Sequence, residues 1–585
     1  MACEGFVIFG STDKIIFGVA LAMCLASCQP PQAVLQPADL VLRGGTVHTV
    51  STTQPSAESI AVTGGEIVFV GGNELVEAYI GPTTEVVELD GRLVMPGLID
   101  AHLHPIRGAL KELYQCNFPF TATPSDIQAA IERCVKEMPE SEWIIGGQWS
   151  SDFFDRFDIE SPRKFLDAVS GDKAVVLGDD ATHNDWVNTK ALQLAGFDAN
   201  TPDPAGGKFE RDADGMPNGI LIENATKLMR PFTASYNDVQ YVAAAREFSR
   251  IANSFGITGA KGAGLYNEEV AAFYAADQRG ELTVHAAVCI RTPDGQRTEP
   301  LDYDQIETVR DRYTSEHVQL DFVKIFLDGV PTPARTAAML APYLPDEEHG
   351  DDFNGGQLHV GIHPLAADLI ELDKRGFTVK MHTAGDRSVR IALDAIEAAR
   401  KANGNSGRRH ELAHAGYIDP ADLPRFAELN AVVDLSPIIW HPSPIINAIV
   451  SAVGVERGTK YWPVRDILDT NAAVLGGSDW PSVAPDVNPW IGIEAFVTRQ
   501  DPREQTPGVL WPEQAISLIE AIEIYTIHGA RALRLEHRIG TLEVGKLADF
   551  IILDRNIFEI PIKDVGDTKI SRTYFEGNLV YEQIN

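Results

Sequence analysis

Two histidines separated by a single residue open the region in which apolar segments alternate with helical patterns. His102 and His104 end the segment 98–104, and Pro105 follows them. Because side chains alternate along a strand, both imidazoles point to the same side of it, whereas Leu103 points to the other side. Two imidazoles at one strand end can share a metal ion. A lone pair of this kind is also compatible with two ordinary polar residues at a strand end.

Four more polar residues lie toward the ends of other apolar segments. They are Lys324, His382, His414 and Asp479. In a barrel of parallel strands, active sites are built at the carboxyl ends of the strands. One buried histidine at such a position is usually hydrogen-bonded structure, but six polar residues at one rim indicate a shared site.

Eight apolar segments predict the strands that position these six residues. They are 98–104, 257–262, 284–290, 321–328, 377–383, 409–414, 431–436 and 472–479. Helical patterns lie between them, for example at 267–279, 365–375 and 386–401, and this alternation indicates a parallel sheet. Eight such strands predict an α/β fold, a (β/α)₈ TIM barrel over residues 98–535. The count requires that residues 106–250 form an insertion after the first strand.

The two ends of the chain have a different pattern. Short strand-like segments with paired glycines and an Asp90-Gly91 turn occupy residues 39–97, and residues 536–585 repeat this pattern with a Gly577-Asn578 turn. We therefore expect a small β-sandwich domain that is built from both termini.

The segment Met95–His104 resembles the opening motif of the amidohydrolase superfamily. Three further segments, 323–329, 382–387 and 477–481, are similar to its amidohydrolase 3 branch, which includes N-substituted formamide deformylases. The resemblance covers residues 39–580 and implies a hydrolase acting on C–N bonds other than peptide bonds. It also implies the metal ligands of the superfamily, which in strand order are His102, His104, Lys324, His382, His414 and Asp479.

The resemblance gives Lys324 and Asp479 particular roles. An ordinary ammonium repels a metal ion, but in the family the amine reacts with carbon dioxide, and the carbamate bridges two cations. A buried lysine paired with Asp321 or Asp328 is the alternative. Asp479 is expected to take a proton from the attacking water and to deliver it to the departing nitrogen. The expected cofactor is one or two divalent ions, with zinc first and iron or manganese as alternatives.

Residues that contact substrate are expected in the predicted insertion and on the barrel rim. The insertion leaves and re-enters the fold beside the first strand, so it is expected to cover the barrel mouth. We expect His183 and Trp149 of the insertion to contact substrate, and Arg387 and Trp440 are further candidates on the rim. The alternative is that the aromatic residues of the insertion form its own core.

The first 27 residues have the pattern of an export signal. Their apolar run at 15–27 is too short to span a bilayer and ends in Leu25-Ala26-Ser27-Cys28, which resembles the lipobox of bacterial lipoproteins. We expect Cys28 to carry lipid, residues 28–38 to form a tether, and the protein to face the periplasm. Gln29 after the cysteine favours the outer membrane. Glu4 and Asp13 depart from the usual positive start, and a disordered or mis-started N-terminus is the alternative.

Composition limits the partners. The chain has 49 basic and 83 acidic residues and a formal net charge of −34. This charge disfavours nucleic acid and anionic membrane surfaces, so we expect a small-molecule substrate and membrane contact through the lipid alone. The oligomeric state is left open, with a homodimer as one option. The six cysteines contain no CxxC pair and predict neither a disulfide framework nor a thiolate metal site.

Two rival functions share most of these features. A tethered binding lipoprotein on an inactive barrel is disfavoured because all six expected ligands are present. A deaminase or phosphotriester hydrolase would keep the fold and change the chemistry. Lys324 argues against the deaminase branches, which usually use one metal and no bridging lysine.

Overall fold

The computed structural model describes residues 36–583, apart from residues 120, 151–152, 180–183, 205–206, 234, 294, 347–348, 356–357, 438–440 and 483. The predicted signal peptide and Cys28 lie outside the described residues, as do two of the predicted substrate contacts, His183 and Trp440. No helix in the described part of the chain is long and apolar enough to cross a membrane.

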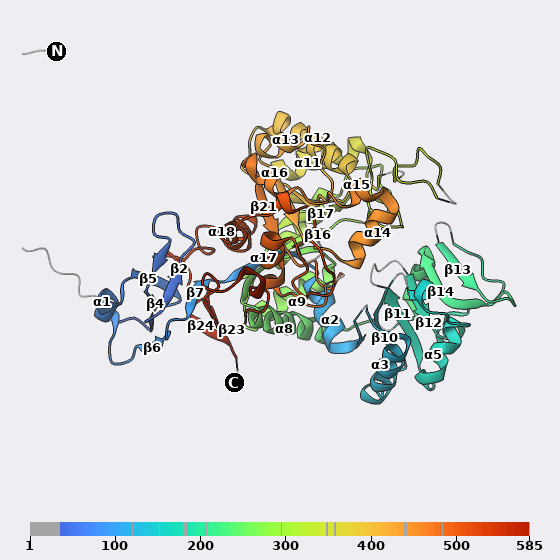
Figure 1. Cartoon of the computed structure of the whole chain (residues 1–585), viewed down its shortest axis with the longest axis horizontal. Coiled ribbons are helices and arrows are strands. Elements are labelled where there is room, and N and C mark those ends of the chain that lie inside the picture. Colours follow the sequence, from blue (N-terminus) through green and yellow to red (C-terminus); the bar gives the residue numbers. More distant parts are fainter. Residues whose placement is uncertain are drawn as a thin grey trace, which may run out of the picture. The chain divides into compact units, whose positions relative to one another are not determined.

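An eight-stranded parallel sheet forms the barrel (Figure 1). Its strands are β8 (Leu98–Leu103), β15 (Ile257–Leu265), β16 (His285–Arg291), β17 (Val318–Phe326), β18 (Thr378–Thr383), β19 (Glu411–His414), β20 (Val432–Leu435) and β21 (Ala473–Gly476). The first and last strands are joined where the chain leaves them, because Asp479 N–H donates to the His102 carbonyl at 2.7 Å and His104 N–H donates to the Trp480 carbonyl at 2.7 Å. The predicted (β/α)₈ fold is confirmed.

Helices accompany these strands. They include α2 (Pro105–Tyr114), α8 (Asp238–Ser254), α9 (Asn267–Asp277), α11 (Ile362–Lys374), α12 (Asp386–Asn403) and α17 (Pro489–Thr498). In α12 the residues Val389, Ala392, Ile396 and Ala399 are buried at intervals of three and four, the spacing of one helix face. Strands β8 and β15 are buried along their whole length, as expected for a parallel sheet covered on both faces.

Two further sheets form the β-domain of the chain ends. One has the order β5-β4-β1-β6 and the other β24-β23-β22-β7-β2-β3. Their strands are β1 (Leu40–Arg43), β2 (Thr46–His48), β3 (Ser56–Ala57), β4 (Ser59–Thr63), β5 (Glu66–Gly71), β6 (Glu85–Glu88), β7 (Leu93–Pro96), β22 (Phe550–Leu553), β23 (Ile570–Phe575) and β24 (Asn578–Glu582). Leu42 and Ile60 of the first sheet share a core with Phe550 and Tyr574 of the second. Both chain ends therefore contribute to one domain.

A single glycine connects this domain to the barrel. Gly97 separates β7 from β8, and a Cβ atom at this position would lie 2.1 Å from Oγ1 of Thr258. Any larger residue would push the first barrel strand away from β15. This close approach explains the glycine in the motif that precedes His102 and His104.

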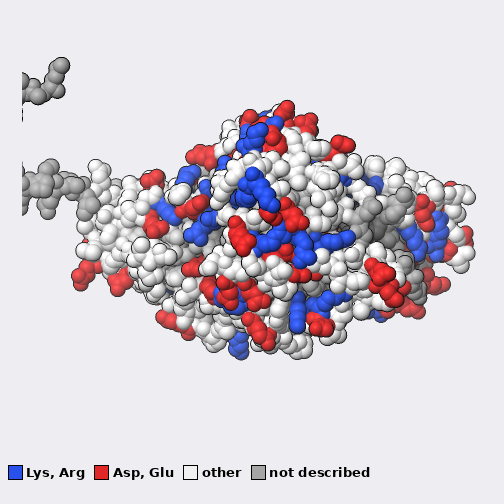
Figure 2. Space-filling model, turned by 90° about the horizontal axis from the view of Figure 1, so that it is seen from above, with Lys and Arg blue, Asp and Glu red and all other residues white. Residues whose placement is uncertain are grey.

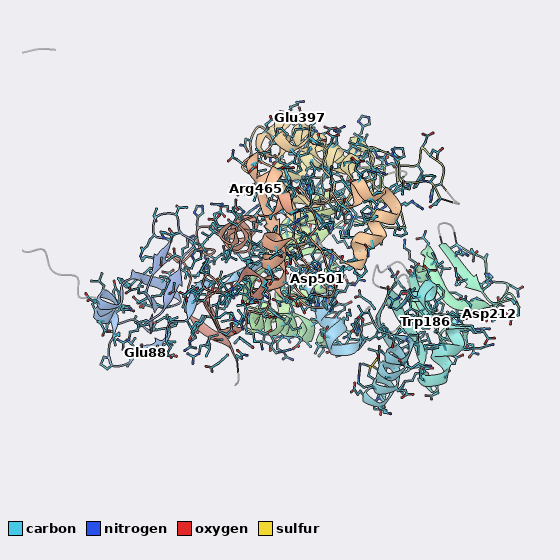
Figure 3. All side chains as sticks on the ribbon, in the orientation of Figure 1. Glu88, Trp186, Asp212, Glu397, Arg465 and Asp501 are labelled. Atoms are coloured by element: carbon cyan, nitrogen blue, oxygen red, sulfur yellow. A yellow bond between two sulfur atoms is a disulfide. The ribbon has the colours of Figure 1, made fainter. Side chains whose placement is uncertain are left out.

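The insertion has a six-stranded sheet of its own, ordered β13-β14-β12-β11-β10-β9. Its strands are β9 (Cys116–Asn117), β10 (Trp143–Trp149), β11 (Ala174–Asp179), β12 (Asn184–Val187), β13 (Gly207–Arg211) and β14 (Pro217–Glu223), with helices such as α3 (Pro124–Glu137) and α5 (Pro162–Ser170). Trp186 is fully buried inside this domain (Figure 3). Helices α2 and α8, by contrast, bury their apolar sides in the barrel core. The inserted domain is therefore shorter than the predicted range of 106–250.

A disulfide links Cys116 of β9 to Cys134 of α3, with their Cα atoms 5.7 Å apart. The sequence predicted no disulfide framework, and this single disulfide was not foreseen. The pairing depends on how α3 packs across the edge of the sheet, and the separation of 18 residues carries no signature of that contact.

Candidate metal centre

Three of the predicted ligands converge where the first and last barrel strands end. His102 belongs to β8, His104 follows it, and Asp479 follows β21. The Nε2 atoms of His102 and His104 lie 3.5 Å and 3.4 Å from Oδ1 of Asp479. The candidate ligand atoms of the three residues all lie within 4.8 Å of one another, so one cation can contact all three.

Two more predicted ligands place their imidazoles next to those of the first group. The ring centroid of His414 lies 4.8 Å from that of His102 and 4.4 Å from that of His382. Nε2 of His382 is 2.9 Å from the Gly329 carbonyl, which can only accept a hydrogen bond, so this nitrogen carries the proton. The lone pair of His382 therefore lies on Nδ1, and that atom is the one available to a metal.

Burial keeps these imidazoles neutral. It lowers the pKa of His104 and lowers those of His102 and His414 well below the ordinary value, with the charge of Lys324 contributing in each case. The pKa of His382 is lowered to about 3, mainly by burial and secondly by the charge of Lys324. Neutral imidazoles offer the lone pairs that metal binding requires.

The environment of one ring nitrogen of His102 shows whether a metal would fit this site. Its Nε2 is buried and has no hydrogen-bond partner among the residues that the structure describes. A buried polar atom without a partner costs free energy unless something absent from the polypeptide satisfies it. Together with the neighbouring imidazoles and the Asp479 carboxylate, this nitrogen forms a donor set that suits a divalent transition metal.

Lys324 is buried in the same region, with 1% of its surface exposed. Burial and the charge of Lys380 lower the pKa of Lys324 to about 8. Neither carboxylate proposed as its partner forms an ion pair with it within the described ranges. Asp328 instead accepts hydrogen bonds from the N–H groups of Ala338 and Ala384 at 2.9 Å, while Asp321 lies 3.9 Å from Arg534. The structure thus leaves the Lys324 amine without the anionic partner of an ordinary buried lysine.

Asp434 was missed by sequence reasoning. Its carboxylate lies 2.6 Å from Nδ1 of His102 and also accepts a hydrogen bond from Lys380. This contact fixes the tautomer of His102 and directs Nε2 toward the other ligands, as outer carboxylates do at many metal sites. An acidic residue within the apolar run Val432–Leu435 was the signal that could have revealed it.

Glycine at position 477 allows the last strand to pass close to the first. A Cβ atom at Gly477 would lie 2.5 Å from the backbone nitrogen of His102. The Asp100 carboxylate joins the same two segments by accepting the N–H groups of His102 at 3.0 Å and Ser478 at 3.1 Å. These contacts bring Asp479 to the histidines.

The structure places the predicted substrate contacts Trp149 and Arg387 as follows. Trp149 is buried in the core of the insertion, and its indole N–H donates to the Leu177 carbonyl at 2.9 Å. The expectation that it contacts substrate was wrong, because its side chain points into the insertion. Its neighbour Gln148 faces the barrel, where its amide donates to the Pro481 carbonyl at 3.3 Å. Arg387 lies half-buried in the first turn of α12, and its role stays a prediction.

Comparisons with known proteins identify the family and agree with the fold. A model of the amidohydrolase family matches residues 85–581. The chain belongs to the amidohydrolase family. It is 30% identical to Protein LONG AFTER FAR-RED 3 of Arabidopsis thaliana, over 95% of this chain and 94% of that protein. It is 28% identical to an N-substituted formamide deformylase of Arthrobacter pascens, over 93% and 98% of the two chains.

A solved structure shows the same fold. It is described as an uncharacterized metal-dependent hydrolase from Pyrococcus horikoshii OT3, with a TM-score of 0.69 and 23% sequence identity. The match covers 89% of this chain and 99% of the archaeal one. The family thus supports the assignment of this chain as a hydrolase, and the solved structure shows the fold.

Proposed function

We propose that the protein hydrolyses an amide-type C–N bond of a small molecule, such as an amide or a formamide. The observation that carries the proposal is the convergence of neutral imidazoles on the Asp479 carboxylate, at 3.5 Å from His102 and 3.4 Å from His104. The relative that is named as a formamide deformylase supports the bond type.

His102, His104, His382, His414 and Asp479 would hold one or two divalent ions, with zinc as our first expectation. A metal bound there supplies a Lewis acid for the substrate carbonyl and favours ionisation of a water. We further propose that Lys324 reacts with carbon dioxide. Its neutral amine would form an N–C bond and lose a proton, and the resulting carbamate would offer two oxygen ligands. A pKa of about 8 gives Lys324 a substantial neutral fraction near neutral pH.

Asp479 moves the proton in this proposal. Its carboxylate takes a proton from the attacking water and delivers it to the departing nitrogen, which is too basic to leave without one. The side chain is 14% exposed, so it can reach substrate while its backbone N–H remains bonded to His102. Asp434 keeps His102 in one tautomer throughout, since its contact is with the nitrogen that faces away from Asp479.

The test is metal analysis of the purified protein combined with a panel of amides, formamides, carbamates and phosphotriesters. We expect bound divalent metal and hydrolysis of one amide-type class, both lost in a His102→Ala/His104→Ala variant. A protein that binds metal but prefers phosphotriesters would retain the site and overturn the proposed bond type. Absence of metal in the correctly folded wild type would overturn the metal site itself.

The insertion is proposed to form one wall of the substrate site. Gln148 connects it to the loop after Asp479 through the Pro481 carbonyl, and Nζ of Lys111 on α2 donates to the Gln148 side chain at 3.3 Å. We expect Gln148→Ala to change kcat/KM unequally across the substrate panel. Arg133→Gln on α3 is a control within the same domain, and equal effects of both variants would contradict this role.

Anchoring in a bacterial envelope is a separate proposal, based on the lipobox-like sequence before Cys28. The disulfide between Cys116 and Cys134 supports export, because disulfides persist mainly in oxidising compartments. Expressed in a bacterium, the wild type should fractionate with membranes, and Cys28→Ser should be released as soluble protein. A wild type that is already soluble would contradict the proposal.

A further inference from the structure

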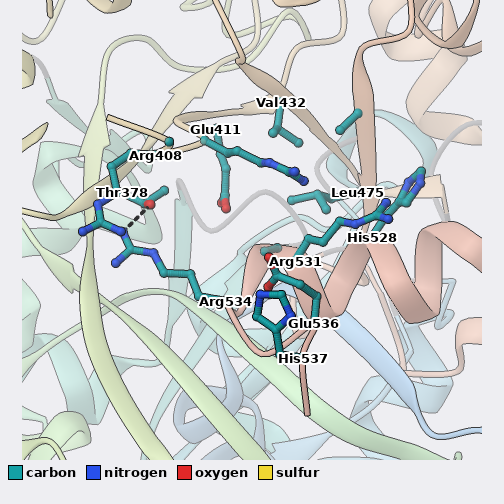
Figure 4. Close-up of a pocket in the computed structure, with 14 residues that line it drawn as sticks. Thr378, Arg408, Glu411, Val432, Leu475, His528, Arg531, Arg534, Glu536 and His537 are labelled. Carbon is teal, nitrogen blue, oxygen red and sulfur yellow. Dashed lines mark hydrogen bonds between the residues drawn. The ribbon is translucent and has the colours of Figure 1, made fainter. Parts of the chain in front are cut away.

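A pocket of about 300 Å³ lies at the opposite end of the barrel from the metal ligands (Figure 4). Its walls include Thr378, Val432 and Ala473, which are the first residues of β18, β20 and β21. The predicted metal ligands, by contrast, lie near the last residues of such strands or just after them. The segment 528–537, which comes after the last barrel strand β21 in sequence, supplies the other wall. No part of the proposed hydrolysis uses this pocket.

Basic side chains dominate its lining. They are Arg408, Arg409, His528, Arg531, Arg534 and His537. The chain as a whole carries a formal charge of −34, so a local excess of arginine is unusual for it. On the face shown in Figure 2, basic and acidic side chains are interspersed. An electropositive pocket on an acidic protein needs a specific explanation.

Three of these arginines have free guanidinium groups. Within the described ranges, Arg408, Arg409 and Arg531 form no ion pair and no side-chain hydrogen bond with the protein. Arg534 is held in place, since it donates to Oγ1 of Thr378 at 2.6 Å and to the Gly376 carbonyl at 3.0 Å. Both of these acceptors are uncharged, and the one carboxylate that pairs with Arg534 within the described ranges is Asp321, at the long distance of 3.9 Å.

The two carboxylates in the pocket wall leave this excess in place. Glu411 pairs with two lysines of the barrel interior, at 2.5 Å from Lys261 and 3.1 Å from Lys380. Its negative charge is therefore already compensated by these two lysines. Glu536 and Asp321, which pairs with Arg534, together offset at most two of the four guanidinium charges.

The charges are also close to one another. Figure 4 shows Arg408 beside Arg534 at one side of the pocket, and Arg531 with His528 at the other. Burial and the neighbouring Arg408 lower the pKa of Arg534 to about 10. Guanidinium groups crowded together in a partly desolvated recess are unfavourable without an anion, and their planar donors match oxyanions in a bidentate manner.

We propose that this pocket binds a small phosphate-type oxyanion, free or as part of a small molecule. The basic groups on two sides suit an anion with two phosphate units, such as pyrophosphate, better than a single phosphate. The site is separate from the metal centre and does not depend on the proposed hydrolysis.

The test is calorimetric titration of the full-length protein with pyrophosphate and, separately, with inorganic phosphate. We expect saturable binding, tighter for pyrophosphate, and an increase in Tm on binding. Arg408→Gln/Arg531→Gln should weaken the affinity by at least about tenfold, because two charge-assisted contacts are lost. Neither side chain supports the fold through a hydrogen bond, and their removal relieves repulsion, so in the absence of anion the variant should have a Tm at least as high as that of the wild type. Arg133→Gln on the insertion removes the same type of charge and should bind as the wild type does.

Other outcomes would overturn the proposal. One is the absence of saturable binding by either anion. Another is equal affinity in the wild type and in Arg408→Gln/Arg531→Gln. A third is binding that persists in that variant but disappears in His102→Ala/His104→Ala, since the anion would then be at the metal centre. If the double variant is unstable, Arg531→Gln alone, at an exposed position, gives the same comparison.

Discussion

The two ends of the barrel both collect side chains that can carry positive charge, but the side chains differ in kind. At the carboxyl ends of the strands these are histidines, and burial lowers their pKa values so that they are neutral. At the amino ends they are mainly arginines, which keep their charge in any protein environment. Neutral nitrogen donors suit a cation, and permanent cations suit an anion. Residue type thus decides which ligand each end can bind.

A network of buried charges occupies the barrel interior between the two ends. Glu411 lines the arginine pocket and pairs with Lys380, Lys380 pairs with Asp434, and Asp434 contacts His102. Every member of this network is buried and paired, as buried charges must be. The variants below separate residues that act on the metal from residues that only hold the barrel together.

Asp479→Asn should have the largest effect at the metal end. The amide keeps the size of the side chain but cannot carry a proton between water and leaving group, so kcat should fall by about 10²–10⁴-fold. Metal content should remain close to that of the wild type, because the histidines remain. Steady-state kinetics and metal analysis of the same preparation measure both. A loss of less than about tenfold would mean that another residue moves the proton.

Lys324→Ala should reduce both metal content and activity. We expect a loss of about 10²-fold or more, since removing a ligand should exceed the 10–100-fold cost of removing an outer partner. Added bicarbonate should help the metal-free wild type to regain metal and should not help the variant. A variant with unchanged metal content and rate would exclude Lys324 as a ligand.

Asp434→Asn should lower metal affinity by about 10–100-fold, because His102 loses the partner that fixes its tautomer. The variant also removes the anionic partner of Lys380, so it should be less stable than the wild type. Competition with a metal chelator measures the affinity, and a denaturant midpoint measures the stability.

Asp373→Asn is the matched control. Asp373 contacts Nε2 of His410 at 3.1 Å, so it is also a buried carboxylate–histidine pair, but His410 lies just before β19, at the arginine end of the barrel. This variant should lose stability and keep its metal affinity. Equal losses of metal affinity in both variants would show that the metal responds to barrel stability, and not to the orientation of His102.

The sequence predicted the barrel because its strands and helices follow local patterns, and the same patterns placed the expected ligands at one end of it. Each of the eight strands is rich in apolar residues, and each expected ligand lies near the end of one. The inner network was harder to predict because its contacts cross the barrel. Asp434 and His102 are separated by 332 residues, and no local pattern pairs them.

In the insertion, too, the sequence alone could not predict which side chains contact each other. An aromatic residue such as Trp149 suits both a pocket and a core, and composition alone does not choose between them. Trp149 enters the core of the insertion, whereas its neighbour Gln148 faces the barrel. The orientation of β10 had to be known before the residue that faces the barrel could be chosen.

The smallest predicted effect concerns His317, which lies just before β17 at the amino end of the barrel. Burial opposes its charged form, but Glu576 and Asp277 outweigh burial and raise the pKa of His317 to about 9. Its ring nitrogens lie 2.7 Å from Asp277 and 3.4 Å from Glu576, which belongs to the β-domain. A histidine at this end is therefore charged at neutral pH, in contrast to those at the metal centre.

A raised pKa in the folded state means that protonation of His317 stabilises the fold. The contribution is fully present below the unfolded value of about 6.5 and is lost as the pH rises through about 9. Allowing for the partial exposure of His317, we expect its protonation to add about 1–2 kcal/mol to the free energy of unfolding. Denaturant midpoints of the wild type and of His317→Gln, measured on both sides of this interval, give the difference between the two proteins. That difference should shrink toward high pH, and a constant difference would show that the charge of His317 does not contribute.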